Sequence, residues 1–217
     1  MKLLYSNILP LGTADDQQTI IDCFQEQLAK ADYVEIAVGY VSRASLEELD
    51  NLISDYSIKQ ICLNIGMYYI EGMPESSYHT AVKINKKWRA SRTGEIRIVR
   101  SFKYHGKLYC FYKDGVPFSA IIGSANLGVI KLEASNRRQY EISSLTIDPS
   151  ECKEISDFIQ KLKAPACSAN IEDISDMPLI FEKNTALSGI ELVAEVPPSK
   201  RAGRDIADDN LERDDRD

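Results

Sequence analysis

The sequence predicts an α/β sandwich, in which one sheet is covered by helices on both faces. Two observations predict this fold class. Short runs rich in β-branched residues alternate along the chain with longer segments whose apolar residues recur at helical spacing. The chain also has 217 residues, of which 44% are hydrophobic, enough for one well-packed domain plus an appendage. No internal repeat is visible.

The order of the predicted elements follows from local signals. Thr13 with Asp16, and Ser45 with Glu48, are capping pairs that predict two helix starts. Pro74 suits the first turn of a third helix. The predicted elements are a helix over residues 13–31, a strand over 33–38, a helix from residue 45, a strand over 58–65, an aromatic loop around 67–69, a helix over 74–92, a strand over 95–100, a hairpin over 105–126, a strand over 139–147 and a helix over 149–162.

The predicted hairpin carries most of the chemically active side chains. His105 and Lys107 share one face of its first strand, with about 6.7 Å between them, because alternate residues of a strand point the same way. The same parity places Ser124 beside Asn126 on the return strand. An imidazole, a cation and two neutral hydrogen-bonding groups at one place predict a phosphoryl-transfer site that needs no metal.

The pattern His-x-Lys followed by Gly-Ser-x-Asn resembles the signature of the phospholipase D superfamily. Four required residues recur in order, which makes the resemblance specific. One position departs from it, because Tyr112 stands where the family has an Asp of mainly structural role. The hairpin is also about four residues longer than usual, with Asp114 and Gly115 at its tip as in a tight turn.

The resemblance implies a phospholipase-D-like α/β/α sandwich with a central mixed sheet flanked by helices. It also implies a domain organisation. Residues 1–165 would form the nuclease domain, and residues 166–196 would extend it. The residue pattern beyond 164 is weaker, and it predicts one strand at 178–182 and another at 190–196. Residues 197–217 are highly charged, so we expect either a linker to a separate DNA-recognition domain or a solvated tail.

The resemblance further implies how one signature completes an active site. Members with a single signature form homodimers in which the two motifs meet across a two-fold axis. One His105 would then attack phosphorus to form a phosphohistidine, and the partner's His105 would protonate the leaving oxygen. Lys107 and Asn126 would hold the non-bridging oxygens, and Ser124 would help to position the phosphate or the loop.

Members of the superfamily also carry a downstream carboxylate that orients a catalytic imidazole. Glu141 is the first candidate for this role, and Glu133 is the second. An alternative interpretation of Glu141 is a structural ion pair with Arg137 or Arg138.

The substrate class follows from size and charge as well as from the resemblance. Residues 81–107 hold nine basic residues and one acid, a net charge of +8 that leads into the hairpin. A solvated helix face is the alternative interpretation of this basic run. The chain is similar to metal-independent restriction endonucleases of the neisserial type, which implies DNA as the substrate and a separate recognition domain or partner subunit.

Two other functions stay open at this stage. One is a phospholipase or phosphatidyl transferase of the same superfamily. The other is a non-catalytic DNA-binding subunit that keeps the fold. Tyr68, Tyr69 and Trp88 could stack on bases, but such residues are more often part of the packing.

Composition predicts the surroundings in which the protein works. Its five cysteines are odd in number and scattered, which is typical of free thiols in a reducing compartment. With only two histidines and no paired cysteines, we expect neither a metal nor a cofactor. The N-terminal apolar run is too short for a signal peptide and no apolar stretch approaches 18 residues, so we expect a cytoplasmic protein without membrane contact.

Overall fold

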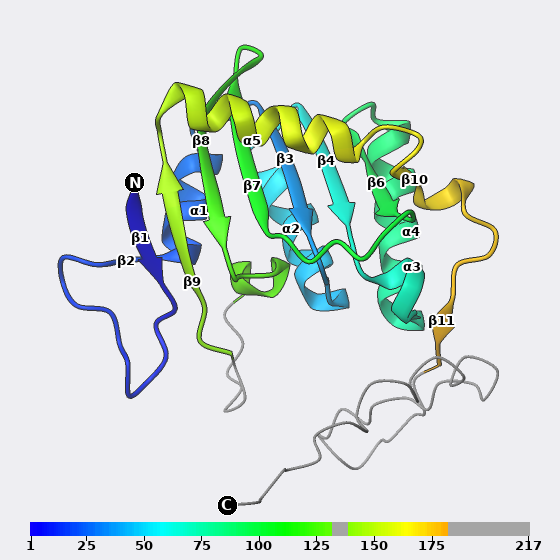
Figure 1. The fold of residues 1–217 in the computed structure, drawn as a ribbon, viewed down its shortest axis with the longest axis horizontal. Coiled ribbons are helices and arrows are strands. Elements are labelled where there is room, and N and C mark those ends of the chain that lie inside the picture. The colour runs from blue at the N-terminus through cyan, green and yellow to red at the C-terminus, as the bar shows by residue number, and fades with distance from the viewer. Residues whose placement is uncertain (132–138, 182–217) are drawn as a thin grey trace, which may run out of the picture.

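The described part of the chain forms a nine-stranded mixed sheet with helices on both faces (Figure 1). The structure is a computed structural model that describes residues 1–131 and 139–181. In these residues, the strands are β1 (Lys2–Tyr5), β2 (Gln18–Thr19), β3 (Tyr33–Val38), β4 (Gln60–Ile65), β5 (Met73–Pro74), β6 (Gly94–Val99), β7 (Leu108–Lys113), β8 (Val116–Gly123), β9 (Ile142–Thr146), β10 (Ser168–Asn170) and β11 (Leu179–Ile180). The helices are α1 (Ile20–Leu28), α2 (Arg43–Asp55), α3 (Tyr68–Glu71), α4 (Glu75–Ala90) and α5 (Pro149–Leu162), with short 3-10 turns η1 (Leu127–Ile130) and η2 (Ile171–Asp173).

The sheet changes direction at its centre. Its strand order is β10-β6-β4-β3-β7-β8-β9-β1-β2. β3, β4 and β6 run parallel, whereas β7 pairs antiparallel with β3 and begins an antiparallel series through β8, β9 and β1. Crevices at such a change of direction are common ligand sites in α/β folds. The predicted mixed sheet flanked by helices is therefore confirmed.

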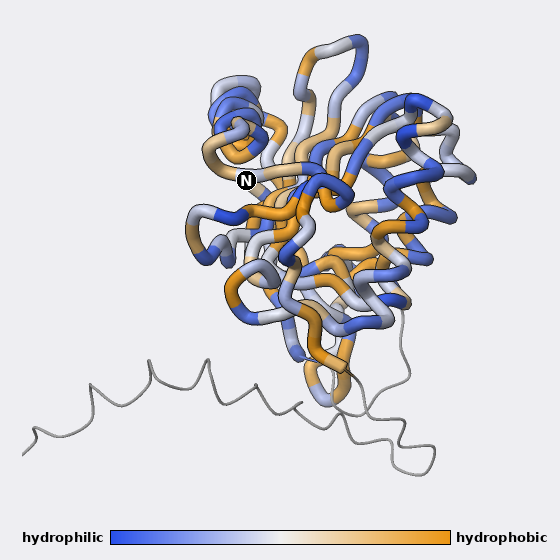
Figure 2. Tube along the Cα trace, turned by 90° about the vertical axis from the view of Figure 1, so that its right-hand side faces the viewer, coloured by the Kyte–Doolittle hydropathy of each residue, from blue (hydrophilic) through white to orange (hydrophobic). Residues whose placement is uncertain are grey.

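Side-chain alternation along β3 separates two cores. Val34, Ile36 and Val38 pack on the face that α1, α2 and α4 cover, together with Phe24, Leu46, Leu49 and Trp88. Ala37 faces the other side, where α5 crosses the sheet and contributes Cys152, Ile159 and Leu162. Hydrophobic residues accordingly lie in the strands at the centre of the molecule (Figure 2), and the polar faces of the helices point outward.

The β7–β8 hairpin turns at the predicted dipeptide. Asp114 and Gly115 have φ angles of 51° and 77°, which a tight hairpin turn requires. The register of the two strands shifts between Phe111 and Tyr112, so the hairpin also contains an irregularity.

Two helix starts lie elsewhere than predicted. α1 begins after Thr19 rather than at Thr13: the Thr19 hydroxyl accepts a hydrogen bond from the Asp22 backbone N–H at 3.0 Å. This second capping pair directly precedes the apolar run, which explains why it is the one used. α2 begins after Ser42, and Ser45 forms the other half of that capping box.

Other elements differ in extent or were missed. The expected loop around residues 67–69 contains the short helix α3, and the expected strand over 139–147 is confined to β9. β1, β2, β5 and β10 were not predicted, because very short strands carry little periodicity. The strand expected at 178–182 is confirmed as β11. The strand expected at 190–196 and the charged segment 197–217 lie outside the described residues.

The cysteines are free thiols, as predicted, and four of the five are buried. Within residues 1–131 and 139–181, no helix is long and apolar enough to span a bilayer.

Candidate functional site

The site lies at the open ends of the β7–β8 hairpin. His105 and Lys107 precede β7 and Ser124 and Asn126 follow β8, so the prediction that they sit on the strands themselves was wrong. The two strand ends nevertheless stay together, because the Gly123 backbone N–H donates to the Lys107 carbonyl at 3.3 Å. The four predicted side chains therefore lie on two chain segments that the hairpin holds side by side.

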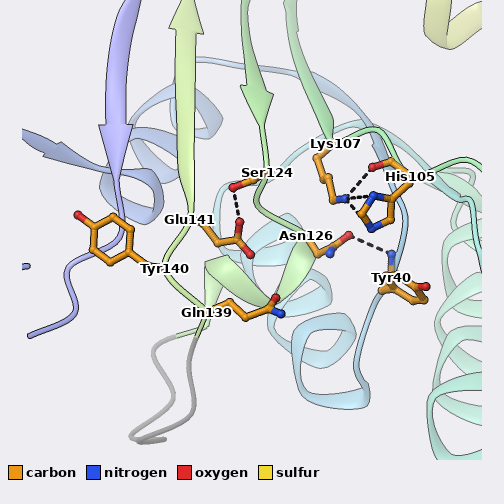
Figure 3. A pocket seen from close by; sticks show the side chains of 8 residues that line it. All are labelled: Tyr40, His105, Lys107, Ser124, Asn126, Gln139, Tyr140 and Glu141. Atoms are coloured by element: carbon orange, nitrogen blue, oxygen red, sulfur yellow. Dashed lines mark hydrogen bonds between the residues drawn. The ribbon is translucent and has the colours of Figure 1, made fainter. Parts of the chain in front are cut away.

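These segments border a cavity of about 630 Å³. It holds all five residues predicted for the site, and Figure 3 shows them converging on one space. The lining residues are Tyr40, His105, Lys107, Ser124, Asn126, Gln139, Tyr140 and Glu141.

Lys107 and His105 are in direct contact where they line the cavity. The Lys107 ammonium lies 3.0 Å from both ring nitrogens of His105 and donates to the His105 carbonyl at 2.6 Å. Lys107 is only 6% exposed. Burial lowers the pKa of the Lys107 ammonium, and the negative charge of Glu141 acts in the opposite direction. A cation thus lies beside the exposed imidazole of His105, where it would attract an anionic group.

Asn126 is fixed by the chain that leaves β3. Its Oδ1 accepts a 3.0 Å hydrogen bond from the Tyr40 backbone N–H (Figure 3). This contact engages the carbonyl end of the amide, so the NH₂ end is the one available as a donor. Gly39, the residue before Tyr40, lies close to both side chains. A Cβ on Gly39 would stand 3.1 Å from His105 Cδ2 and 3.5 Å from Asn126 Oδ1. Gly39 therefore lets the end of β3 pack against both site residues.

Ser124 and Glu141 form a hydrogen-bonded pair across β8 and β9. The Ser124 hydroxyl donates to Glu141 Oε2 and accepts from the Ile142 backbone N–H at 3.1 Å. The backbone of Glu141 is held by Ser6 at the end of β1, through a 3.0 Å bond to the Ser6 hydroxyl and a 3.1 Å bond from the Ser6 N–H. Two strands thus fix the position of this carboxylate.

The role predicted for Glu141 was to orient an imidazole. Within the described residues, its hydrogen bond goes to Ser124 and none joins it to His105 of the same chain. Orientation of a second protomer's imidazole by Glu141 stays a prediction. The fallback Glu133 and the alternative partners Arg137 and Arg138 lie outside the described residues.

Three cavity residues were missed by sequence reasoning. Gln139 and Tyr140 directly precede Glu141 and enter with it. Tyr40 follows the predicted strand Tyr33–Val38, and its ring meets the His105 ring edge-on with centroids 5.8 Å apart. Its place at the carboxyl end of a central strand was a usable signal, since ligands bind at that edge of α/β sheets.

Tyr112, which stands where the family signature has an Asp, lies away from the cavity and contacts a carboxylate. It donates to Glu35 on the neighbouring strand β3, and Glu35 is completely buried. Tyr33, Gln160 and Lys163 also donate to the same carboxylate, Lys163 at 2.6 Å. The carboxylate that the resemblance places at 112 is thus supplied from the adjacent strand.

The basic run does not form one surface leading to the cavity. Of its nine basic residues, only Lys107 is among the cavity-lining residues of the described chain. Lys87 pairs with Asp50 at 2.8 Å and Arg89 pairs with Glu172 at 3.3 Å, both on or beside α4. The α4 part of the run is therefore a helix face whose charges are partly neutralised, which is the alternative interpretation. Trp88 and Tyr68 are core residues, as favoured from the sequence.

In the described part of the chain, no cluster of three or more His, Cys, Asp or Glu side chains has an arrangement that could hold a metal ion.

The arrangement supplies the parts of a phosphodiester-cleaving site. His105 presents an imidazole at an exposed position, Lys107 supplies a positive charge, and Asn126 supplies a hydrogen-bond donor. The Ser124–Glu141 pair adds a carboxylate at the opposite wall. Such groups stabilise the charge that develops on phosphoryl oxygens during transfer.

Comparison with solved structures supports the fold. Among solved structures, the chain is similar to phosphatidylserine synthase from Haemophilus influenzae Rd KW20, with a TM-score of 0.50 and 12% identity. The match covers 77% of this chain but only 39% of that protein, and at this identity it shows the fold alone. No curated protein matches the sequence.

A family match covers well over half of the 217 residues. Residues 18–176 match the family described as the NgoFVII restriction endonuclease N-terminal PLD domain, in which PLD denotes phospholipase D. The matched range contains the whole hairpin and every residue that lines the cavity. The chain therefore belongs to this family of phospholipase-D-like restriction endonuclease domains.

Proposed function

We propose that the protein is a metal-independent DNA endonuclease that works as a homodimer through a covalent phosphohistidine. The observation that carries the proposal is the convergence of His105, Lys107, Asn126 and the Ser124–Glu141 pair on one cavity. The family membership supports DNA as the substrate, since the family is that of a restriction endonuclease domain.

The proposed reaction has two displacements at phosphorus. In the first, a ring nitrogen of His105 attacks, the P–N bond forms, and the bond to the leaving ester oxygen breaks. The partner subunit's His105 gives its proton to that oxygen. In the second, water attacks phosphorus, passes a proton to the partner's His105, and the P–N bond breaks. Lys107 and Asn126 hold the non-bridging oxygens throughout.

An exposed apolar surface supports the dimer. Leu3, Ser144 and Ile122 lie in one row across β1, β9 and β8, and Ile142 lies on the same face. Leu3, Ile122 and Ile142 are 50%, 43% and 50% exposed, beside Ser124. α5 crosses the sheet nearer its other end and leaves this area uncovered (Figure 1). A second copy seated on this surface would bring its own cavity close to this one.

We also propose that another domain or subunit reads the DNA sequence. The cavity walls offer phosphate-binding groups rather than a base-reading helix or ribbon. The chain carries a net charge of −7, so a dimer is more acidic still and would hold DNA weakly by itself.

The test is cleavage of supercoiled plasmid DNA in excess EDTA by wild type, His105→Ala and His79→Ala. His79 is the matched control, because it is the other histidine of the chain and lies exposed on α4, 3.5 Å from Glu75. We expect wild type and His79→Ala to cleave and His105→Ala to be inactive. After alkaline denaturation and digestion, a peptide that carries a nucleotide linked through phosphorus to His105 should be recovered, since the P–N bond is lost in acid.

The alternatives predict different results. A phospholipase or phosphatidyl transferase would release headgroup from phospholipid vesicles and leave plasmid intact, with the same dependence on His105. A non-catalytic DNA-binding subunit would bind DNA equally well with Ala at 105 and cleave neither substrate. Cleavage that requires added magnesium would contradict the proposed mechanism.

A further inference from the structure

Tyr40 stands between the nucleophile and a hydrogen-bonded anchor outside the cavity. Its ring is half-buried and meets the His105 imidazole at an interplanar angle of 75°. It also meets the Tyr68 ring, with centroids 5.5 Å apart and an interplanar angle of 71°. The Tyr40 ring therefore contacts both a core aromatic residue and the imidazole of His105.

The Tyr40 hydroxyl is tied to a charged pair. It donates a 2.5 Å hydrogen bond to Glu71 Oε2, and the Lys103 ammonium donates to Glu71 Oε1 at 3.1 Å. The hydrogen bond from Tyr40, followed by the one from Lys103, lowers the pKa of the Glu71 carboxyl despite some desolvation. Burial and the same carboxylate raise the pKa of Tyr40 to about 12. The anchor is thus a neutral phenol donating to an ionised carboxylate at neutral pH.

The two residues that hold the Tyr40 hydroxyl in place come from different parts of the chain. Glu71 ends helix α3, which follows β4, and Lys103 is two residues before His105. The segment that carries His105 is therefore tied to α3 through Lys103 and to the end of β3 through the Tyr40 ring. In addition, the Tyr40 backbone holds Asn126. One residue fixes two groups of the cavity that are 21 positions apart in sequence.

We propose that Tyr40, anchored by Glu71, is a positioning residue that holds the His105 ring in the orientation for attack on phosphorus. This inference rests on the proposed function, in that His105 is the nucleophile. An imidazole on an exposed segment can rotate about its side-chain bonds, and only a few orientations aim a ring nitrogen in line with the leaving oxygen. A fixed aromatic neighbour removes the unproductive orientations before the substrate arrives.

The first experiment compares Tyr40→Phe, Glu71→Ala and the double variant with Tyr69→Phe in the EDTA cleavage assay. Tyr69 is the matched control, because its hydroxyl also donates to a carboxylate, that of Asp176 at 2.9 Å, but it does not line the cavity. We expect kcat to fall about tenfold in both single variants, with KM nearly unchanged in Tyr40→Phe. The double variant should be no worse than either single one, since both remove the same bond.

The turnover number is the relevant quantity because Glu71→Ala also frees the Lys103 ammonium. A freed cation near the cavity changes DNA affinity and therefore KM rather than the chemical step. Circular dichroism melting accompanies each variant. Wild-type kcat in Tyr40→Phe and Glu71→Ala, or a loss seen equally in Tyr69→Phe, would overturn the proposal.

The second experiment is independent of DNA cleavage. Diethyl pyrocarbonate modifies both histidines, and mass spectrometry gives the rate at His105 relative to His79 within each molecule. We expect this ratio to rise in Tyr40→Ala and Tyr40→Phe and to stay constant in Tyr69→Phe. An unchanged ratio in Tyr40→Ala means that Tyr40 does not restrain His105 and ends the proposal.

The two experiments separate this inference from the proposed function. If His105→Ala keeps full cleavage activity, the proposed function is wrong, whatever the modification ratio shows. If His105→Ala is inactive but the Tyr40 variants keep the wild-type modification ratio and kcat, the proposed function stands and the positioning role is wrong.

Discussion

The Tyr112 hydroxyl donates a 2.5 Å hydrogen bond to the completely buried carboxylate of Glu35 on the adjacent strand. Tyr112 occupies the position at which an Asp was expected, and the two residues together place a carboxylate between β3, β7 and α5. Because Gln160 and Lys163 also bind this carboxylate, it ties α5 to the sheet. The departure from the usual signature is thus compensated by a residue 77 positions earlier.

Introducing the expected acid should therefore destabilise the fold. Tyr112→Asp would place a second carboxylate beside Glu35 and remove one of its donors, and we expect the free energy of unfolding to fall by about 3–5 kcal/mol. Tyr112→Phe removes only the donor and should cost about 1–3 kcal/mol. Urea unfolding followed by circular dichroism measures both. Adding Glu35→Gln should recover part of the loss in Tyr112→Asp; equal stability of the Asp and Phe variants would contradict like-charge repulsion.

The lowered pKa of Lys107 predicts an early alkaline loss of activity. Its ordinary value is 10.5, and burial favours the neutral amine, so Lys107 loses its proton at a lower pH than a free lysine. The proposed chemistry needs the cation. As the pH rises, kcat should therefore begin to fall before pH 10.5 is reached. In Lys107→Arg the guanidinium stays charged, so its decline should begin at higher pH, from a lower maximum rate. Identical alkaline limbs in the two pH–kcat profiles would rule out Lys107 as their cause.

Gly39 should resist enlargement because of where its Cβ would stand. In Gly39→Ala that atom would lie 3.1 Å from His105 Cδ2 and 3.3 Å from Met67 Cγ, so the imidazole must shift by a few tenths of an ångström. We expect kcat to fall at least about tenfold with little change in melting temperature. The control is Gly128→Ala, whose Cβ would meet nothing within 4 Å. Equal activity of the two variants would show that the packing at Gly39 is not critical.

The exposed apolar surface beside the cavity should be needed for dimerisation. Ile122→Asp places a charge among Leu3, Ile122 and Ile142, and we expect it to shift the protein from dimer to monomer and to abolish cleavage. Val116→Asp is the control, since Val116 is 64% exposed at the far end of β8. Sedimentation velocity measures the mass. If Ile122→Asp is still a dimer, the interface lies elsewhere on the protein. If the wild type is a monomer, the proposed dimer is wrong.

The part of the site that could be predicted is the part that is local in sequence. His105 with Lys107, and Ser124 with Asn126, are each two residues apart, and a hairpin joins the two pairs. Their convergence therefore needs only the strand pattern and the turn. The same holds for α5, whose start at Pro149 and end at Leu162 carry clear local signals.

The part that could not be predicted depends on pairing between distant segments. Tyr40 reaches Asn126 across 86 positions, because β3 pairs with β7 in the sheet. Strand order and register of this kind are not encoded by periodicity. The start of α1 was ambiguous for a different reason, since Thr13 with Asp16 and Thr19 with Asp22 have the same spacing, and only packing of the residues that follow decides between them.

The Asp114–Gly115 turn lies at the opposite end of the hairpin from His105 and Asn126. Additional residues at this tip lengthen the hairpin without moving any reacting group, which explains why a longer hairpin is compatible with an intact cavity. The same geometry makes the turn a practical attachment point for a fluorophore or affinity tag, because a label there would report on the working protein without disturbing its chemistry.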